Sequence, residues 1–273
     1  MKLAVSNIAW DANADDAAAA VLVREGVGGI ELAPTKWRAA PYDATATDVA
    51  ELRKSWEDRG LPIVSLQSLL FGRPELQLLG GEPERRAMMD HLRRVADFAA
   101  AVGARRLVFG SPKNRVRGER AVDDAMRMSA DFFRALAPHA RDRGVIFCIE
   151  ANPPEYGCDF ITRTSEAVEL CRMVEDSSIR VNADVGGMIL ANENPEDTIA
   201  RAAAFVAHVH ASEPQLGLPS SESAHQSAAS ALAQGNYSGW VSIEMRAPAP
   251  NNQIEGLERA IRFAKRAYAV VSR

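Results

Sequence analysis

Four segments of this chain end in the same way, with an apolar run that stops at a side chain able to bind a metal ion. The runs VIFCIE, IRVNAD, FVAHVH and WVSIE end at Glu150, Asp184, His210 and Glu244. Two glutamates, an aspartate and a histidine form a mixed oxygen and nitrogen ligand set for a divalent cation, and such cations take part in catalysis. We therefore treat the four residues as a candidate metal site.

The surroundings of the two glutamates favour this interpretation over simpler ones. A single glutamate at a strand end is more often a solvated end or an ion-pair partner. Glu150 and Glu244, however, both follow nearly continuous apolar runs, so we expect both carboxylates to be partly removed from water. A buried carboxylate needs a partner of opposite charge, and a cation is the natural one.

The elements that must position these residues alternate between strands and helices along the whole chain. Residues 3–10, 29–33, 62–66, 106–109, 145–150, 179–184, 206–210 and 240–245 have strand patterns. Residues 14–25, 47–59, 83–102, 119–143, 165–175, 195–204, 224–234 and 254–270 have helical patterns. Strict alternation implies parallel strands joined by helical crossovers.

Eight such units predict a single (β/α)₈ barrel that occupies residues 1–273 as one domain. An open doubly wound sheet is the alternative, but the first strand-to-helix turn lacks the G-x-G-x-x-G pattern of a dinucleotide site. In a (β/α)₈ barrel the active site lies at the carboxyl ends of the strands. The four candidate ligands lie there on strands five to eight, at intervals of 34, 26 and 34 residues.

Composition excludes several other classes of protein. The net charge is −4 with acidic and basic residues interspersed, which gives no electrostatic footprint for a nucleic acid or an anionic membrane. No apolar stretch approaches the length that spans a bilayer. The three cysteines lack C-x-x-C spacing, which disfavours a disulfide framework and a structural zinc site and fits a reducing cytoplasm.

From SNIAW at the first strand to SIEMR at the last, the chain resembles the xylose isomerase-like barrel superfamily. Within it, the resemblance is to the sugar phosphate isomerases and epimerases, which include the ketose 3-epimerases. It implies that Glu150, Asp184, His210 and Glu244 hold one divalent metal, with manganese favoured over magnesium, cobalt or zinc. It also implies that Glu150 and Glu244 form the acid/base pair, that the substrate is a small carbohydrate, and that the chain forms a homodimer.

One position departs from the ketose 3-epimerase pattern. Those enzymes place a substrate-contacting histidine three residues after the aspartate of strand six, whereas this chain has Gly187 there. The basic residue expected in the loop after strand seven is also absent from Ser212-Glu213-Pro214-Gln215. The metal centre therefore carries over from the resemblance, but the shell of residues that binds the sugar does not.

The expected activity is isomerisation or epimerisation of a keto-sugar or polyol derivative, by carboxylate proton abstraction through a metal-bound enediolate. An inosose-type dehydratase with the same metal centre is the nearest alternative, because it shares the proton abstraction and then expels a β-hydroxyl. A non-catalytic sugar-binding partner subunit is a second alternative. Apurinic endonucleases share the superfamily, but they need many more histidines than the five present.

We expect the substrate contacts to come from the loops at the barrel mouth. The candidates are Lys113, Arg115, Asn152, Glu213, Arg246, Gln67 and Trp37. Each has a simpler alternative role. The cations of the FGSPKNRVR loop and Arg246 are equally suited to surface ion pairs, Gln67 and Glu31 to a polar layer of the barrel, and Asn152 to a turn cap. Packing is the commoner role of a tryptophan.

Overall fold

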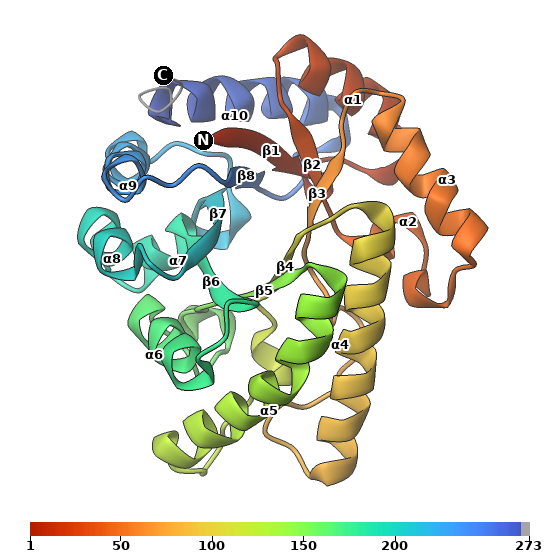
Figure 1. The fold of residues 1–273 in the computed structure, drawn as a ribbon. Helices are drawn as coiled ribbons and strands as arrows, with labels where there is room; N and C mark the ends of the chain where they lie inside the picture. The colour runs from red at the N-terminus through yellow and green to blue at the C-terminus, as the bar shows by residue number, and fades with distance from the viewer. Residues whose placement is uncertain (269–273) are drawn as a thin grey trace.

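The computed structural model describes residues 1–268, and its centre is a closed barrel of parallel strands (Figure 1). The strands are β1 (Lys2–Ser6), β2 (Gly29–Leu32), β3 (Ile63–Leu66), β4 (Arg106–Phe109), β5 (Ile146–Glu150), β6 (Ile179–Asp184), β7 (Val206–Ser212) and β8 (Trp240–Glu244). Each strand pairs with the next in sequence, and β8 pairs with β1 to close the barrel. The predicted (β/α)₈ fold, a TIM barrel, is confirmed.

The helices surround this barrel (Figure 1). They are α1 (Asp15–Arg24), α2 (Pro34–Trp37), α3 (Ala46–Glu57), α4 (Glu82–Val102), α5 (Val122–Arg143), α6 (Thr164–Val174), α7 (Val185–Leu190), α8 (Pro195–Ala202), α9 (Glu222–Gln234) and α10 (Gln253–Tyr268). Two short helices, α2 and α7, were not predicted. The predicted helix over 254–270 corresponds to α10, and its positions 269 and 270 lie outside the described residues.

Local sequence signals explain where several helices begin. At α8, the Asn194 side chain accepts a hydrogen bond from the Asp197 amide, and Pro195 occupies the first helical turn. At α3, Thr45 and Asp48 form a reciprocal capping box. The apolar faces of the outer helices pack on the barrel. For example, the ring of Phe133 in α5 packs edge to face on that of Phe109 in β4, with 5.2 Å between ring centroids.

Two strand boundaries differ from the predicted ones by two residues or more, and the others agree to within one residue. The strand expected over 3–10 ends at Ser6, because the chain turns into a short 3₁₀ helix (Asn7–Ala9) whose Ile8 amide donates to the Ser6 hydroxyl. β7 continues two residues past His210, because Ala211 and Ser212 pair with Ile243 and Glu244 of β8. His210 therefore lies inside the ladder and pairs with Asp184 of β6.

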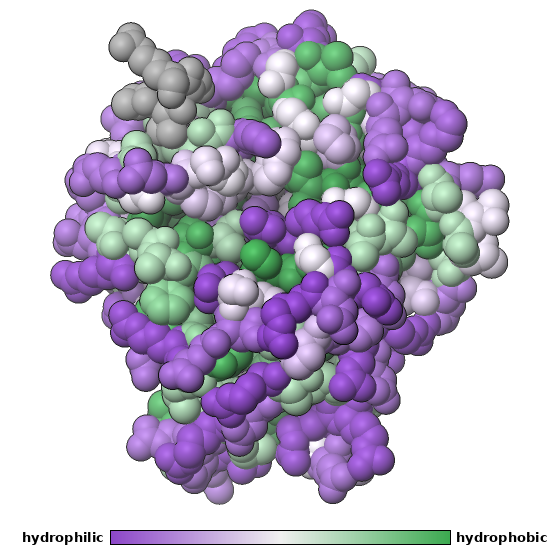
Figure 2. Space-filling view, viewed as in Figure 1, coloured by the Kyte–Doolittle hydropathy of each residue, from purple (hydrophilic) through white to green (hydrophobic). Residues whose placement is uncertain are grey.

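Hydrophilic residues cover much of the outer helices, with apolar patches between them (Figure 2). Within residues 1–268, no helix combines the length and the apolar character that crossing a bilayer requires.

Candidate functional site

The four candidate ligands converge on one atom, Nδ1 of His210. This atom lies 3.1 Å from Oε2 of Glu244, 3.2 Å from Oε2 of Glu150 and 3.6 Å from Oδ2 of Asp184. Ligand atoms of Glu150, Asp184 and His210 all lie within 4.8 Å of one another. Strands β5 to β8 thus bring three carboxylates and one imidazole to the same point at the barrel mouth.

Negative charge exceeds positive charge in this cluster, because three carboxylates face one imidazole. His210 is fully buried, and Glu150 and Glu244 are 8% and 9% exposed. Burial disfavours the charged imidazole, yet the nearby carboxylates of Glu244 and Glu31 raise the pKa of His210 well above its usual value. Burial also raises the pKa of Glu244; the His210 charge opposes this shift, and the charges of Glu150 and Asp184 add to it.

These residues fit a divalent cation. Nδ1 of His210 is buried and has no aligned hydrogen-bond partner within residues 1–268, although three carboxylates face it. Three acidic groups crowded around a neutral imidazole nitrogen are the donor set that a divalent metal requires, and metal binding would replace the proton that the cluster otherwise retains. Glu150, Asp184, His210 and Glu244 would hold the metal.

Glu150 is held rigidly by its neighbours. The side-chain amide of Asn152 donates to Oε1 and that of Asn182 donates to Oε2, each over 2.7 Å. Gly110, just after β4, lies against the same carboxylate, and a Cβ at position 110 would overlap Oε1 of Glu150. The carboxylate is therefore fixed from three sides, whereas Glu244 receives no amide donor from the described part of the chain.

Asp184 is fixed in a different way, by the start of α7. Its carboxylate accepts hydrogen bonds from the Gly187 amide and, over 2.7 Å, from the Ser212 hydroxyl. A Cβ at position 187 would lie 2.8 Å from Oδ1 of Asp184, closer than side chains pack. The glycine that departs from the ketose 3-epimerase pattern thus lets the backbone approach a candidate ligand closely.

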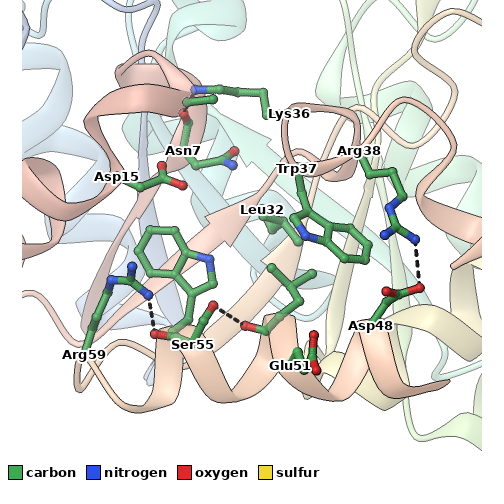
Figure 3. Close-up of a pocket in the computed structure, with 13 residues that line it drawn as sticks. Asn7, Asp15, Leu32, Lys36, Trp37, Arg38, Asp48, Glu51, Ser55 and Arg59 are labelled. Carbon is green, nitrogen blue, oxygen red and sulfur yellow. Dashed lines mark hydrogen bonds and ion pairs between the residues drawn. The ribbon is translucent and has the colours of Figure 1, made fainter. Parts of the chain in front are cut away.

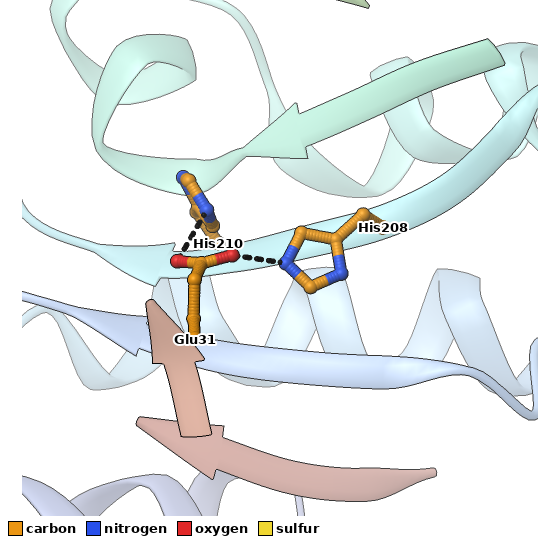
Figure 4. A group of neighbouring side chains, drawn as sticks. All are labelled: Glu31, His208 and His210. Atoms are coloured by element: carbon orange, nitrogen blue, oxygen red, sulfur yellow. Dashed lines mark hydrogen bonds and ion pairs between the residues drawn. The ribbon is translucent and has the colours of Figure 1, made fainter. Parts of the chain in front are cut away.

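A functional residue that the sequence interpretation left open is Glu31 of β2. Its fully buried carboxylate lies between His208 and His210 of β7 (Figure 4). It lies 2.7 Å from Nε2 of His208 and 3.0 Å from Nε2 of His210, and Ser65 donates to it over 2.8 Å. Burial raises its pKa, but the charges of His210 and His208 outweigh burial and lower it well below its usual value.

Glu31 thus lies behind the site rather than in it. Its carboxylate lies against Nε2 of His210, so that Nδ1 faces the three carboxylates, and a second carboxylate usually orients a metal-binding histidine in this way. Glu31, His208 and His210 also have ligand atoms within 4.8 Å of one another. We assign Glu31 and His208 to orientation because both are fully buried and line neither of the cavities beside Glu150 and Glu244. The sequence signal that could have identified Glu31 was a single acidic residue within the apolar run GIEL.

Four of the seven predicted substrate contacts line cavities beside the candidate ligands. Two adjoining cavities, of about 210 and 260 Å³, share Gly110, Glu150 and Glu244. Arg246, Asn152 and Glu213 line the first of these cavities, and Gln67 lines the second. The guanidinium of Arg246 is exposed and has no hydrogen-bond or ion-pair partner within residues 1–268.

The structure places the other three, Trp37, Lys113 and Arg115, outside these two cavities. Trp37 lines a separate cavity of about 320 Å³, and residues of α3 form the opposite wall (Figure 3). None of the four candidate ligands lines this cavity. Lys113 is exposed and lines neither of the two cavities, whereas Arg115 is fully buried. Glu213 lines the first cavity, but its carboxylate oxygens accept hydrogen bonds from the loop before α9.

Glu213 anchors that loop. Its carboxylate accepts hydrogen bonds from the amides of Ser220 and Ser221, over 2.7 and 2.6 Å, and lies 3.4 Å from Nε2 of His225. Burial raises the pKa of Glu213, but these hydrogen bonds outweigh burial and lower it to about 2. The carboxylate therefore stabilises the fold in its ionised form.

Comparisons with known proteins agree with this architecture. The sequence profile of the family described as xylose isomerase-like TIM barrel matches residues 19–267. No curated protein sequence matches the chain. Among solved structures, the D-psicose 3-epimerase of Clostridium cellulolyticum H10 superposes with a TM-score of 0.80 at 16% identity, covering 99% of each chain.

Two further structures superpose over nearly the whole chain. The 3-keto-D-glucoside 4-epimerase YcjR of E. coli gives a TM-score of 0.78 at 17% identity, covering 97% of this chain and 99% of the other. The IOLI protein, solved with a bound zinc atom, gives a TM-score of 0.78 at 15% identity and covers 99% of each chain. At these identities the likeness establishes the shared fold.

The environment of Glu213 predicts a pH-dependent effect on stability. Replacing it by glutamine (Glu213→Gln) should lower the free energy of unfolding at pH 7 by about 2 kcal/mol, because hydrogen bonds to a charged group are lost. Since the folded-state pKa is below the usual 4.5, the stabilisation is complete above pH 4.5 and is lost as the pH falls toward about 2. Denaturant unfolding at pH 7 and pH 3 measures both values, with the exposed Glu119→Gln as control. An equal loss at both pH values would contradict the assignment.

Proposed function

Since the chain belongs to the xylose isomerase-like TIM barrel family, we propose that it is a divalent-metal-dependent isomerase or epimerase of a keto-sugar or polyol derivative. The observation that carries the proposal is the convergence of three carboxylates on Nδ1 of His210 beside two open cavities. The epimerase names of two structural neighbours support it. Manganese is the proposed metal, with magnesium, cobalt and zinc as alternatives.

The bound metal would supply Lewis-acid polarisation of a substrate carbonyl. Glu244 is the better placed of the two glutamates to remove a proton from the carbon beside that carbonyl. It lines both cavities, and no amide donor occupies its oxygens within the described residues, so it is freer than Glu150 to reach a substrate proton. Glu150 also lines both cavities and would return a proton from its fixed position.

The residues around the cavities would select the substrate. The exposed guanidinium of Arg246 suits an anionic group or several hydroxyls, because it offers donors only. Gln67 reaches the second cavity while its amide nitrogen donates to the Ser6 hydroxyl, so its carbonyl oxygen is presented to the Ser68 hydroxyl and the cavity. Position 187 contributes no side chain, which leaves recognition to these residues.

The activity is tested with purified protein, manganese and a panel of keto-sugars in D₂O. Proton abstraction beside a carbonyl should place solvent deuterium in an epimeric or isomeric product, which mass spectrometry and chromatography detect. EDTA should abolish the reaction and added manganese should restore it. Formation of an absorbing enone with loss of water would identify a dehydratase instead. Failure to bind any divalent metal would contradict the proposed catalytic function.

Replacing the proposed base should affect turnover far more than folding. Glu244→Gln should lower kcat by about 100- to 10 000-fold, which is the usual contribution of a general base. The melting temperature should stay close to that of the wild type, because glutamine has nearly the same shape as glutamate. The exposed Glu51→Gln is the matched control. A Glu244→Gln variant with more than a tenth of the wild-type kcat would overturn this assignment.

The position of Glu31 predicts an effect on metal binding. Glu31→Gln removes the charge that orients His210, so manganese affinity should fall about 10- to 100-fold, as is typical when such a partner is lost. Isothermal titration calorimetry on the metal-free protein measures this. If Glu31→Gln bound manganese as tightly as the wild type, Glu31 would be only a polar filler of the barrel.

A further inference from the structure

Arg115 is a buried cation without a matching anion. It follows the 3₁₀ turn Pro112–Asn114 after β4 and is 0% exposed. Its Nη2 donates to Oδ1 of Asn152 over 2.8 Å, but Nε and Nη1 have no hydrogen-bond partner, and no carboxylate within residues 1–268 forms an ion pair with it. Removing a guanidinium from water in this way is costly, so a packing role alone does not explain it.

The side chain cannot contact a substrate directly. Arg115 lines neither of the two cavities beside Glu150 and Glu244, although Asn152 lines one of them. The burial of Arg115 does not fit the direct substrate contact that its position in a mouth loop suggests. Among the described residues, its hydrogen-bonded link to the site is the contact of Nη2 with Asn152.

The chemistry of the guanidinium fixes the direction of the hydrogen bonds. Arginine can only donate, so Asn152 must present its carbonyl oxygen Oδ1 to Arg115. The amide nitrogen Nδ2 of Asn152 then faces Glu150 and donates to Oε1 over 2.7 Å. A flipped amide would place two donors against each other and two acceptors against each other. Arg115 thus selects the one orientation in which Asn152 can hold Glu150.

We propose that Arg115 is a positioning residue that acts through Asn152 to fix the Glu150 carboxylate. The proposal rests on the proposed function, in which Glu150 is a metal ligand and a proton-transfer group. The hydrogen bond from Arg115 fixes the amide that restrains Oε1. Loss of Arg115 leaves Oδ1 of Asn152 without this donor, so the amide is less firmly fixed and restrains the Glu150 carboxylate less tightly.

We call the hydrogen bonds from Arg115 to Asn152 and from Asn152 to Glu150 the relay. Manganese titration by calorimetry on metal-free protein tests it with four variants. Arg115→Met should weaken manganese binding about tenfold, and Asn152→Ala about 10- to 100-fold. The double variant should bind no more weakly than Asn152→Ala alone, because both changes remove one relay. Asn152→Asp keeps an acceptor for Arg115 but cannot donate to Glu150, so it should bind as weakly as Asn152→Ala. The exposed Arg127→Met on α5 is the control for loss of charge.

The outcomes separate the relay from the proposed function. Fully additive losses in the double variant, or unchanged affinity in Arg115→Met, would overturn the relay while leaving the metal site intact. A wild-type protein that binds no manganese, magnesium, cobalt or zinc overturns the proposed function and the relay with it. If Arg115→Met does not fold, as judged by circular dichroism, the two Asn152 variants decide. Wild-type affinity in Asn152→Asp would then contradict the relay.

Discussion

Holding three carboxylates against one buried imidazole is the constraint on which the rest of this structure depends. Glu150, Asp184 and Glu244 repel one another, and Nδ1 of His210 lies within 3.6 Å of all three. Without supporting contacts such a cluster would separate or take up protons. Glu150, Asp184 and His210 are accordingly each restrained by residues outside the cluster.

The barrel supplies that restraint from two directions. Below the cluster, Glu31 holds His210 and ties β2 to β7 across the barrel interior. Around its rim, Asn152 and Asn182 hold Glu150, and the start of α7 holds Asp184. Glu244 is the least restrained acidic member, and it also faces both cavities. Hydrogen bonds thus make Glu150 a rigid ligand and leave Glu244 freer to move. The sequence does not reveal this difference, because both glutamates follow the same kind of apolar run.

Local sequence patterns were enough to predict the barrel and to select the four candidate ligands, because the residues next to each other in the sequence determine strand ends and helix caps. Contacts between distant segments were not readable. Glu31 gains its role only when β2 and β7 face each other, and Arg115 lies in a loop where a cation would ordinarily be exposed. The helix α7 was missed because VGGMIL contains two glycines, which disfavour a helix, and the Asp184 cap with its tertiary packing overrides that preference.

The two glycines at the rim limit which positions of the protein can be altered. Gly110 lies against Glu150 and Gly187 against Asp184, so neither position accepts a larger residue without moving a candidate ligand. The sector of the mouth formed by β4 to β6 is therefore closed to redesign. Laboratory evolution toward new substrates has more room in the loops after β3 and β8, which carry Gln67, the exposed Phe71 and Arg246.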